Sequence, residues 1–359
     1  MLLQQSRSSA KLAEAKAVIS GCRTEGGFHA STKLYPELWI RDLVYSEEVL
    51  LKLGYGETVK KHFESFLEKQ RSNGNLPTVI TSFWRRSLNQ TFHFWTCDTE
   101  ILFVIGAFDY ANQTGDVDFI RSNQERIDRC VNFVNGGLNK LGLIPGGDWR
   151  DAIMNLDRMF LLTNQVQLAN MYERLGHKEK SEALKETIRE VFSLPDQSFA
   201  DSVRWDDGVL QKDTHFDCLG SSLGILNGTI PPNDYPGQGG KFQVAYTGFG
   251  HRNVVPVYKE NRARAFRSVR SLNAFVRNGA VFTNRRDAYQ NSAIWPFVEA
   301  RIVAALRKMG MNSEAQKASD RMLSRNGMYE WYGPVDGVGH GSDGQLWTAA
   351  AIVEQAASS

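Results

Sequence analysis

Five segments of the chain combine aromatic residues with polar or charged ones. They are residues 35–42, 92–98, 145–151, 289–296 and 329–334. Sugars bind well to this combination, because an aromatic ring stacks on the C–H face of a pyranose while carboxylates and guanidinium groups hydrogen bond to its hydroxyls. For one segment alone, a buried ring with a hydrogen bond at its tip is the favoured interpretation. The recurrence in five segments favours a sugar-binding site.

Three carboxylates in these segments could act in hydrolysis: Asp148, Asp151 and Glu330. Cleavage of a glycosidic bond needs two carboxyl groups, and an inverting enzyme holds its acid and its base roughly 6.5–9.5 Å apart. Asp151 follows Trp149 closely, and a neighbouring apolar ring can raise a carboxyl pKa by desolvation, although Arg150 would lower that pKa if it pointed the same way. The alternatives are a helix cap for Asp151 and a surface carboxylate for Glu330.

Apolar residues recur at helical spacing along most of the chain, so the elements that position these residues are expected to be helices. Asp116 is expected to cap the helix that begins at Val117, and Gly54, Gly176 and Gly310 are expected to end helices. The expected helices are 7–20, 39–53, 57–71, 98–114, 117–136, 158–175, 178–193, 215–226, 261–275, 291–309, 312–326 and 343–357. The fold class predicted is therefore all-α.

Short glycine-containing turns alternate with long connections along the chain. The long connections span 21–38, 72–97, 137–157, 227–260, 276–290 and 327–342. Long loops in a compact domain usually carry function. Six helical hairpins joined in this way predict a single toroidal domain over residues 1–359, in which inner and outer helices alternate and the long loops gather at one rim. Residues 228–256 could form a lid or surface decoration, and could hold a small β-hairpin because 241–246 alternates weakly between apolar and polar residues.

Several motifs resemble those of the glucoamylase-like and glycogen-debranching six-hairpin glycosidases. Trp39-Ile-Arg-Asp42 resembles their W-x-R-D element, and Gly147-Asp-Trp-Arg-Asp151-Ala152 resembles the T-W-M-D-A element of amylo-α-1,6-glucosidases. Asn291-Ser-Ala-Ile-Trp-Pro296 is similar to G-x-V-W-P, and Cys97-Asp-Thr99 with Tyr110 and Thr114-Gly-Asp116 to D-A-x-L-W-F…Y…T-G-D. Tyr329-Glu-Trp-Tyr332 and Gly344-Gln-Leu-Trp347 stand where these families have the base-bearing loop and a final helix.

The resemblance runs in the same order along nearly the whole chain. It implies an (α/α)6 barrel and an inverting α-glucosidase or close relative, with Asp151 as general acid and Glu330 as general base. The acid follows the debranching pattern, because Arg150 stands where glucoamylases have theirs. The chain is close to a bare catalytic barrel, which makes a small saccharide or a glucosylated small molecule the expected substrate. The expected sugar-contacting residues are Tyr35, Trp39, Arg41, Asp42, Trp95, Asp98, Asp148, Trp149, Arg150, Trp295, Trp331 and Tyr332.

Composition and motifs argue against several other functions. The net charge is only +2, so there is no basic surface of the kind that binds nucleic acid. There is no run of about 18 apolar residues and no leader-like segment, so we expect no membrane span and a cytoplasmic location with reduced cysteines. The seven histidines lack metal-ligand spacing, and no nucleotide-binding motif occurs. We therefore expect no metal and no cofactor; the oligomeric state stays open.

Two other kinds of function fit the same fold. Helical toroids also host sugar epimerases, isomerases and polysaccharide lyases, and a relative that has lost its acid could bind sugars without cleaving them. An epimerase would use histidines across the cleft, and His215 could line the cleft or cap the helix that follows it. The presence of both Asp151 and Glu330 at the matching motif positions favours hydrolysis.

Overall fold

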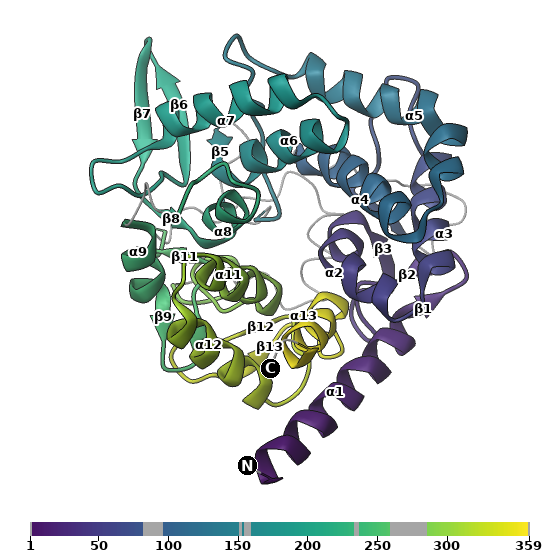
Figure 1. Ribbon diagram of the computed structural model, residues 1–359, viewed down its shortest axis with the longest axis vertical. Helices are drawn as coiled ribbons and strands as arrows, with labels where there is room; N and C mark the ends of the chain where they lie inside the picture. The colour runs from purple at the N-terminus through teal and green to yellow at the C-terminus, as the bar shows by residue number, and fades with distance from the viewer. Residues whose placement is uncertain are drawn as a thin grey trace, which may run out of the picture.

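The computed structural model describes residues 2–81, 96–150, 153, 159–232, 237–258 and 286–357. Helices dominate these residues (Figure 1). They are α1 (Leu2–Cys22), α2 (Ile40–Lys52), α3 (Gly56–Glu68), α4 (Asp98–Thr114), α5 (Val117–Gly136), α6 (Leu162–Arg174), α7 (Lys178–Phe192), α8 (Cys218–Leu226), α9 (Gly237–Ala245), α11 (Pro296–Lys308), α12 (Asn312–Ser324) and α13 (Leu346–Ala357). The prediction of a mainly helical chain is confirmed, and two expected helices, 98–114 and 117–136, match α4 and α5 to the residue. The expected helix 261–275 lies outside the described residues.

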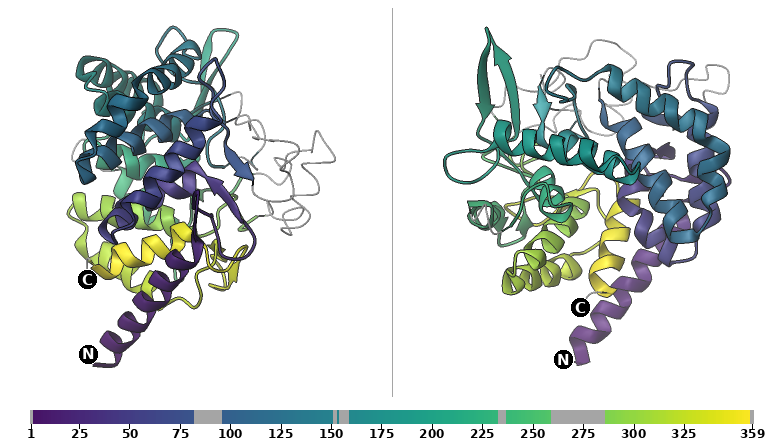
Figure 2. Two further views of the ribbon diagram at one scale, coloured as in Figure 1. Left: turned by 90° about the vertical axis from the view of Figure 1, so that its right-hand side faces the viewer. Right: turned by 45° about the horizontal axis from the view of Figure 1, so that its top comes forward.

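Six helices contact one another in a closed cycle. In order, α2 contacts α4, α4 contacts α6, α6 contacts α8, α8 contacts α11, α11 contacts α13, and α13 contacts α2. The other helices lie outside this cycle, with α1, α3, α5, α7, α9 and α12 packed against its members (Figure 1). Side views show the same arrangement, with the first turns of α1 projecting beyond the body (Figure 2).

Burial follows the position of each helix. The helix α4, within the cycle, is buried over most of its surface, whereas the outer helix α5 buries a single face that includes Phe119, Ile127 and Val134. A helix that is apolar all round needs neighbours on several sides, while an amphipathic one needs a single partner. The apolar pattern of each helix therefore accounts for its position, α4 within the cycle and α5 outside it.

Local signals set several helix ends. The side chain of Asp116 accepts a hydrogen bond from Phe119 N at 3.1 Å, which confirms the predicted cap of α5. Gly54, Gly176 and Gly310 follow helix ends with φ near +80°, a conformation that favours glycine. Asp217 caps α8, so the suggestion that His215 caps it is wrong.

Short antiparallel strands supplement the helices, and the all-α prediction missed them. The strands are β1 (Arg23–Thr24), β2 (Gly27–Phe28), β3 (Glu37–Trp39), β4 (Val79–Thr81), β5 (Phe160–Leu161), β6 (Ser202–Asp206), β7 (Val209–Asp213), β8 (Phe216–Asp217), β9 (Tyr246–Thr247), β10 (Gly250–His251), β11 (Val254–Val255), β12 (Trp331–Tyr332) and β13 (Gly339–His340). The sheet β5–β6–β7 has three strands, and the other pairs are β1–β2, β3–β4, β8–β11, β9–β10 and β12–β13. All of them pair antiparallel.

The small hairpin expected within 228–256 is present as β9–β10, but 241–246 is not its strand, because Gly237–Ala245 forms α9 and β9 begins only at Tyr246. Gln238, Phe242 and Ala245 are buried at helical spacing, whereas Val244 is exposed. The apparent alternation of apolar residues did not reflect the buried face. Within the described residues, no helix is both long and apolar enough to cross a membrane.

Candidate active site

Loops from four parts of the chain enclose a pocket of about 450 Å³. Three of the helices in the cycle begin at it, since Trp39 and Trp295 are the N-cap residues of α2 and α11 and Gln345 immediately precedes α13. The lining residues are Ala30, Tyr35, Trp39, Arg41, Asp42, Trp149, Tyr289, Gln290, Trp295, Glu330, Gln345 and Trp347. The N-terminal ends of helices carry partial positive charge, which favours carboxylates at this end.

Backbone pairing holds the two ends of the chain together at the pocket. Leu346 N donates to Ala30 O at 2.8 Å, and Thr32 N donates to Gly344 O at 3.0 Å. The strand β3 pairs with β4 and leads directly into α2. Residues more than 300 positions apart therefore form one wall.

Glu330 lies in the loop between α12 and α13 and is almost fully buried. Its Oε2 accepts hydrogen bonds from Tyr35 Oη at 3.1 Å and from Ser342 N at 3.3 Å. Gly341, at φ +73°, lies so close to the Glu330 carboxylate that a side chain would displace it. The paired strands β12 and β13 form the adjacent hairpin and fix the direction of this carboxylate.

Asp42 is the second carboxyl group of the pocket, in the first turn of α2. Its Oδ1 accepts a hydrogen bond from Gln345 Nε2 at 2.9 Å. Burial, and after it the negative charge of Glu330, raise the Asp42 pKa from 3.8 to about 8. At neutral pH the Asp42 carboxyl group is therefore protonated, and it can donate a hydrogen bond.

Arg41 supplies the positive charge of the pocket. Its guanidinium forms a bidentate ion pair with Asp98, with Nε to Oδ2 at 2.7 Å and Nη2 to Oδ1 at 3.0 Å. Nη2 also donates to Asp148 O at 3.1 Å, which joins α2 to the loop that carries Trp149. Asp98 is itself buried outside the pocket lining, so it holds Arg41 in place.

Aromatic rings in mutual contact form the opposite wall. The rings of Trp149 and Trp295 meet edge to face at 5.1 Å, Trp295 meets Trp347 at 5.7 Å, and Tyr289 meets Trp295 at 5.1 Å. Among the described residues, none forms a hydrogen bond with Trp149 Nε1, Trp347 Nε1 or Gln345 Oε1, although all three atoms are buried. Buried polar atoms normally have partners, so these three can bind the hydroxyls of a ligand.

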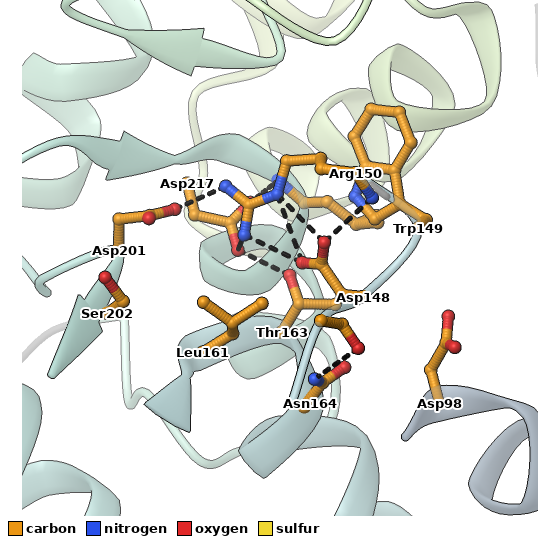
Figure 3. Close-up of polar contacts among 12 residues, drawn as sticks. Asp98, Asp148, Trp149, Arg150, Leu161, Thr163, Asn164, Asp201, Ser202 and Asp217 are labelled. Atoms are coloured by element: carbon orange, nitrogen blue, oxygen red, sulfur yellow. Dashed lines mark hydrogen bonds and ion pairs between the residues drawn. The ribbon is translucent and has the colours of Figure 1, made fainter. Parts of the chain in front are cut away.

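Arg150 points away from the pocket into a buried ionic network (Figure 3). Its guanidinium binds both carboxylate oxygens of Asp148, forms an ion pair with Asp201 and lies 3.6 Å from an Asp217 oxygen. Tyr258 Oη contacts both Arg150 and Asp201. Burial raises the pKa of Asp217 to about 6, against the opposing effect of Arg150. The network anchors the loop on which Trp149 reaches the pocket.

The structure brings seven of the fourteen sequence-predicted residues together as pocket lining: Tyr35, Trp39, Arg41, Asp42, Trp149, Trp295 and Glu330. It places five elsewhere. Asp98, Asp148 and Arg150 are buried in ion pairs, the Trp331 ring stacks on His340, and the Tyr332 ring packs under Arg325. Trp95 and Asp151 lie outside the described residues.

Sequence reasoning did not select four polar or aromatic lining residues: Tyr289, Gln290, Gln345 and Trp347. All four lie within or beside the motifs quoted above. Their closeness in sequence to these motifs was the only feature that could have marked them as pocket residues. The described part of 228–256 contributes no lining residue, and α9 packs against α8. His215 pairs with Asp213, and its ring lies 4.4 Å from that of Tyr258.

Comparisons with known proteins identify the fold. No protein-family model matches the chain. Over 86 residues it is 30% identical to a mannosylglycerate hydrolase of Rubrobacter radiotolerans, a match that spans 23% of this chain and 19% of that protein. The chain thus covers about a fifth of the length of this curated relative.

Solved structures match over almost the whole chain. The GH63 mannosylglycerate hydrolase from Thermus thermophilus, in complex with Tris and D-glycerate, superposes with a TM-score of 0.69 at 12% identity, over 96% of this chain and 99% of the other. A wild-type glycosidase superposes with a TM-score of 0.67 at 12% identity, over 98% and 96%. The resemblance to the six-hairpin glycosidases is thereby confirmed, and the chain has the helical fold of these glycoside hydrolases.

Proposed function

We propose that this protein is an inverting glycoside hydrolase that releases one hexose from a small α-glycoside. The observation that carries the proposal is the pocket itself, in which two buried carboxyl groups, Glu330 and Asp42, lie together and an aromatic wall completes the enclosure.

Glu330 is the proposed general base. The hydroxyl of Tyr35 and the backbone N–H of Ser342 both donate to it, and hydrogen bonds of this kind stabilise an ionised carboxylate. Its negative charge also raises the Asp42 pKa. Glu330 is therefore proposed to be the anion, and Asp42 the neutral group that donates a hydrogen bond. In this assignment Glu330 removes a proton from water, and Asp42 binds a sugar hydroxyl.

Asp151 is the proposed general acid, on the basis of its sequence motif. Trp149 lines the pocket, and Asp151 follows it by two residues. In the proposed reaction, the oxygen of water forms a bond to the anomeric carbon while the bond from that carbon to the glycosidic oxygen breaks. The proton of water passes to Glu330, and the proton of Asp151 passes to the leaving oxygen, so the configuration inverts.

The hexose is proposed to bind between Arg41 and Asp42 on one side and the tryptophans on the other. Trp149 Nε1, Trp347 Nε1 and Gln345 Oε1, which have no hydrogen-bond partner among the described residues, would bind its hydroxyls. The ring faces of Trp39, Trp295 and Tyr289 supply apolar surface for its C–H groups. The buried Asp148 and Arg150 have no part in this proposed contact.

The proposed substrate is an α-glucoside, or the closely related mannoside, with a small leaving group. The curated relative and the solved structure named above are mannosylglycerate hydrolases, which supports glycosylglycerates as the first substrates to test. The partner is thus a small carbohydrate. The described lining residues include no histidine, and no observation favours an epimerase or a lyase.

We also propose the architecture of the fold, an (α/α)6 toroid in a single domain. The closed cycle of six helices, with a helix packed against each member, supports an (α/α)6 toroid. One large hydrophobic cluster draws residues from helices at both ends of the chain, from Ala15 to Val353, which supports a single domain over residues 1–359.

Hydrolysis can be tested by measuring hexose release from glucosylglycerate, mannosylglycerate, maltose, isomaltose, trehalose and sucrose. We expect at least one to be cleaved, and Glu330→Gln and Asp151→Asn each to lower kcat by roughly 10²–10⁴-fold. Glu48→Gln is the matched control, because Glu48 forms an exposed ion pair with Lys52. Full activity in either active-site variant would remove that residue from its proposed role.

A further inference from the structure

A short segment beside the pocket is held in an unfavourable backbone conformation. Asp287, Tyr289 and Ser292 have φ values of 64°, 47° and 78°, in the left-handed region that favours glycine. The described residues contain only two other non-glycine residues with positive φ, Gln197 and Asp207. Such conformations persist where the surrounding structure enforces them, and they cluster at functional sites.

Arg252 enforces this conformation from outside the pocket. Its guanidinium forms an ion pair with Asp287 and donates to Ser292 Oγ at 3.1 Å, so one side chain connects both ends of the segment. Ser292 Oγ donates in turn to Val254 O at 2.7 Å. The hydroxyl of Ser292 therefore ties the strained backbone to β11.

The middle of the segment is fixed by further hydrogen bonds. Asn253 Nδ2 donates to Gln290 O at 2.8 Å, and Trp295 Nε1 donates to Tyr289 O at 2.8 Å. Both carbonyl groups thus bind to protein. The side chains of Tyr289 and Gln290 line the pocket as a result.

Gln290 lies on the Trp149 side of the pocket, and the ring of the preceding Tyr289 packs between those of Trp295, at 5.1 Å, and Trp331, at 6.4 Å. Gln290 Nε2 donates to Trp149 O at 2.7 Å, two residues before the proposed acid, whereas the base Glu330 is bound by Tyr35. In an inverting reaction the acid protonates the leaving oxygen and the base acts from the opposite face. The leaving group must therefore lie on the side of Tyr289 and Gln290.

We propose that Tyr289 and Gln290 contact the group attached to the anomeric carbon, and that Arg252 is a positioning residue that acts through Asp287 and Ser292. This inference rests on the proposed function, because it assigns the leaving-group side of the same pocket. A preformed contact surface lowers the cost of ordering the protein on binding. The strained segment supplies such a surface and selects the leaving group.

The test compares two substrates that share a glycone and differ in leaving group: glucosylglycerate and α-glucosyl fluoride, or the mannosyl pair if the protein prefers mannose. The variants are Tyr289→Asn and Arg252→Lys. Asparagine tolerates positive φ, so Tyr289→Asn is expected to fold. Arg252 Nη1 makes the contacts to both Asp287 and Ser292. Lysine keeps the charge, but its shorter side chain places the ammonium nearer the backbone than Nη1 and is expected to lose these joint contacts. Arg204→Lys is the matched control, because Arg204 forms an exposed ion pair with Asp206 on the β6–β7 hairpin.

We expect the ratio of kcat/KM for the glycerate glycoside to that for the fluoride to fall about tenfold or more in both variants. The ratio is expected to stay unchanged in Arg204→Lys. An unchanged ratio in Tyr289→Asn would overturn the assignment of the contact. Equal loss on both substrates in Arg252→Lys would show that Arg252 supports the fold only, and would overturn its positioning role.

A binding measurement separates this inference from the proposed function. Calorimetry in a Glu330→Gln background, which prevents turnover of the ligand, with and without Tyr289→Asn, would give the affinities for intact glucosylglycerate and for free glucose. We expect the variant to lose affinity for the glycoside by about tenfold and to keep its affinity for glucose. If the wild type binds both ligands and hydrolyses neither glycoside nor fluoride, that result supports the inference while the proposed function fails. Equal affinities of both proteins for the glycoside would overturn the inference, whatever the activity.

Discussion

At the scale of single residues, two carboxyl groups of the pocket, those of Asp42 and Glu330, have different surroundings. Asp42 is buried and receives one hydrogen bond from Gln345, whereas Glu330 receives hydrogen bonds from Tyr35 and Ser342. The pKa of Asp42 rises to about 8, mainly through burial. A carboxyl group with a raised pKa can donate a hydrogen bond to a sugar hydroxyl at neutral pH, whereas a carboxylate that accepts two hydrogen bonds is stabilised in its ionised form.

The raised pKa of Asp42 has a consequence for stability. The unfolded chain releases this proton near the ordinary pKa of 3.8 and the folded protein near 8, so the free energy of unfolding falls as pH rises between these values. Asp42→Asn removes this contribution, of at most about 1.4 kcal/mol per pH unit. We expect the Tm of Asp42→Asn to increase relative to wild type from pH 5 to pH 9. A constant difference, as expected for the exposed control Asp118→Asn, would contradict the assigned pKa.

Arg150 permits a prediction about the buried network. Arg150→Met leaves Asp148, Asp201 and Asp217 without their cation, and loss of one partner of a buried ion pair typically costs about 3–5 kcal/mol. The loss is expected to be smaller at pH 5 than at pH 7.5, because protonation neutralises the remaining carboxylates. Urea denaturation at both pH values measures it. Arg204→Met, at an exposed ion pair, should cost less than about 1 kcal/mol. Equal losses for Arg150→Met at both pH values would contradict the account.

The sequence could not assign Asp148 and Arg150 to this network. The residue between them, Trp149, lines the pocket, and nothing local distinguishes a side chain that faces a sugar from one that faces the interior. The distinction depends on Asp201 and Asp217, which are more than 50 positions away. The segments around Trp39, Trp149, Trp295 and Glu330 were predictable because each keeps its aromatic and charged residues close in sequence.

At the scale of elements, the helices α2, α3 and α4 pack closely together at Gly106 of α4. A Cβ on Gly106 would lie 2.7 Å from Glu47 Oε2 and 2.8 Å from a Phe63 ring carbon. Such overpacking costs roughly 1–3 kcal/mol, so we expect Gly106→Ala to lower the free energy of unfolding by that amount. Gly136, at the end of α5, faces open space, and Gly136→Ala is expected to be neutral or stabilising by up to about 1 kcal/mol. Chemical denaturation compares the two, and equal effects would refute the packing argument.

The helices were more predictable than the strands for a physical reason. Periodic burial along its 20 residues defines α5, and a long apolar run defines α4, whereas most strands here have two or three residues and show no periodicity. The segment that became α9 contains three glycines, and its weak alternation resembled a strand. Its helical state depends on packing against α8, which is a tertiary contact.

At the scale of the whole molecule, the closed cycle of helices brings the two ends of the chain together. The helix α13 packs against α1 and α2, and the loop before it supplies Glu330 to a pocket that also uses Tyr35 and Asp42. The alternation of short and long connections predicted a toroid, and the closed cycle of helix contacts supports that proposal. It could not predict Tyr289 and Gln290 as lining residues, because the strained backbone of 287–292 depends on Arg252 and Asn253.

The central claim is inversion during hydrolysis of a small α-glycoside. The most direct test follows the anomeric protons of the released hexose by NMR in the first minutes after addition of glucosylglycerate or mannosylglycerate. The account predicts that the β-anomer appears first and then mutarotates to the equilibrium mixture, and that Glu330→Gln releases almost none. Initial appearance of the α-anomer, or no hexose from any glycoside of the panel while the sugar still binds, would contradict it.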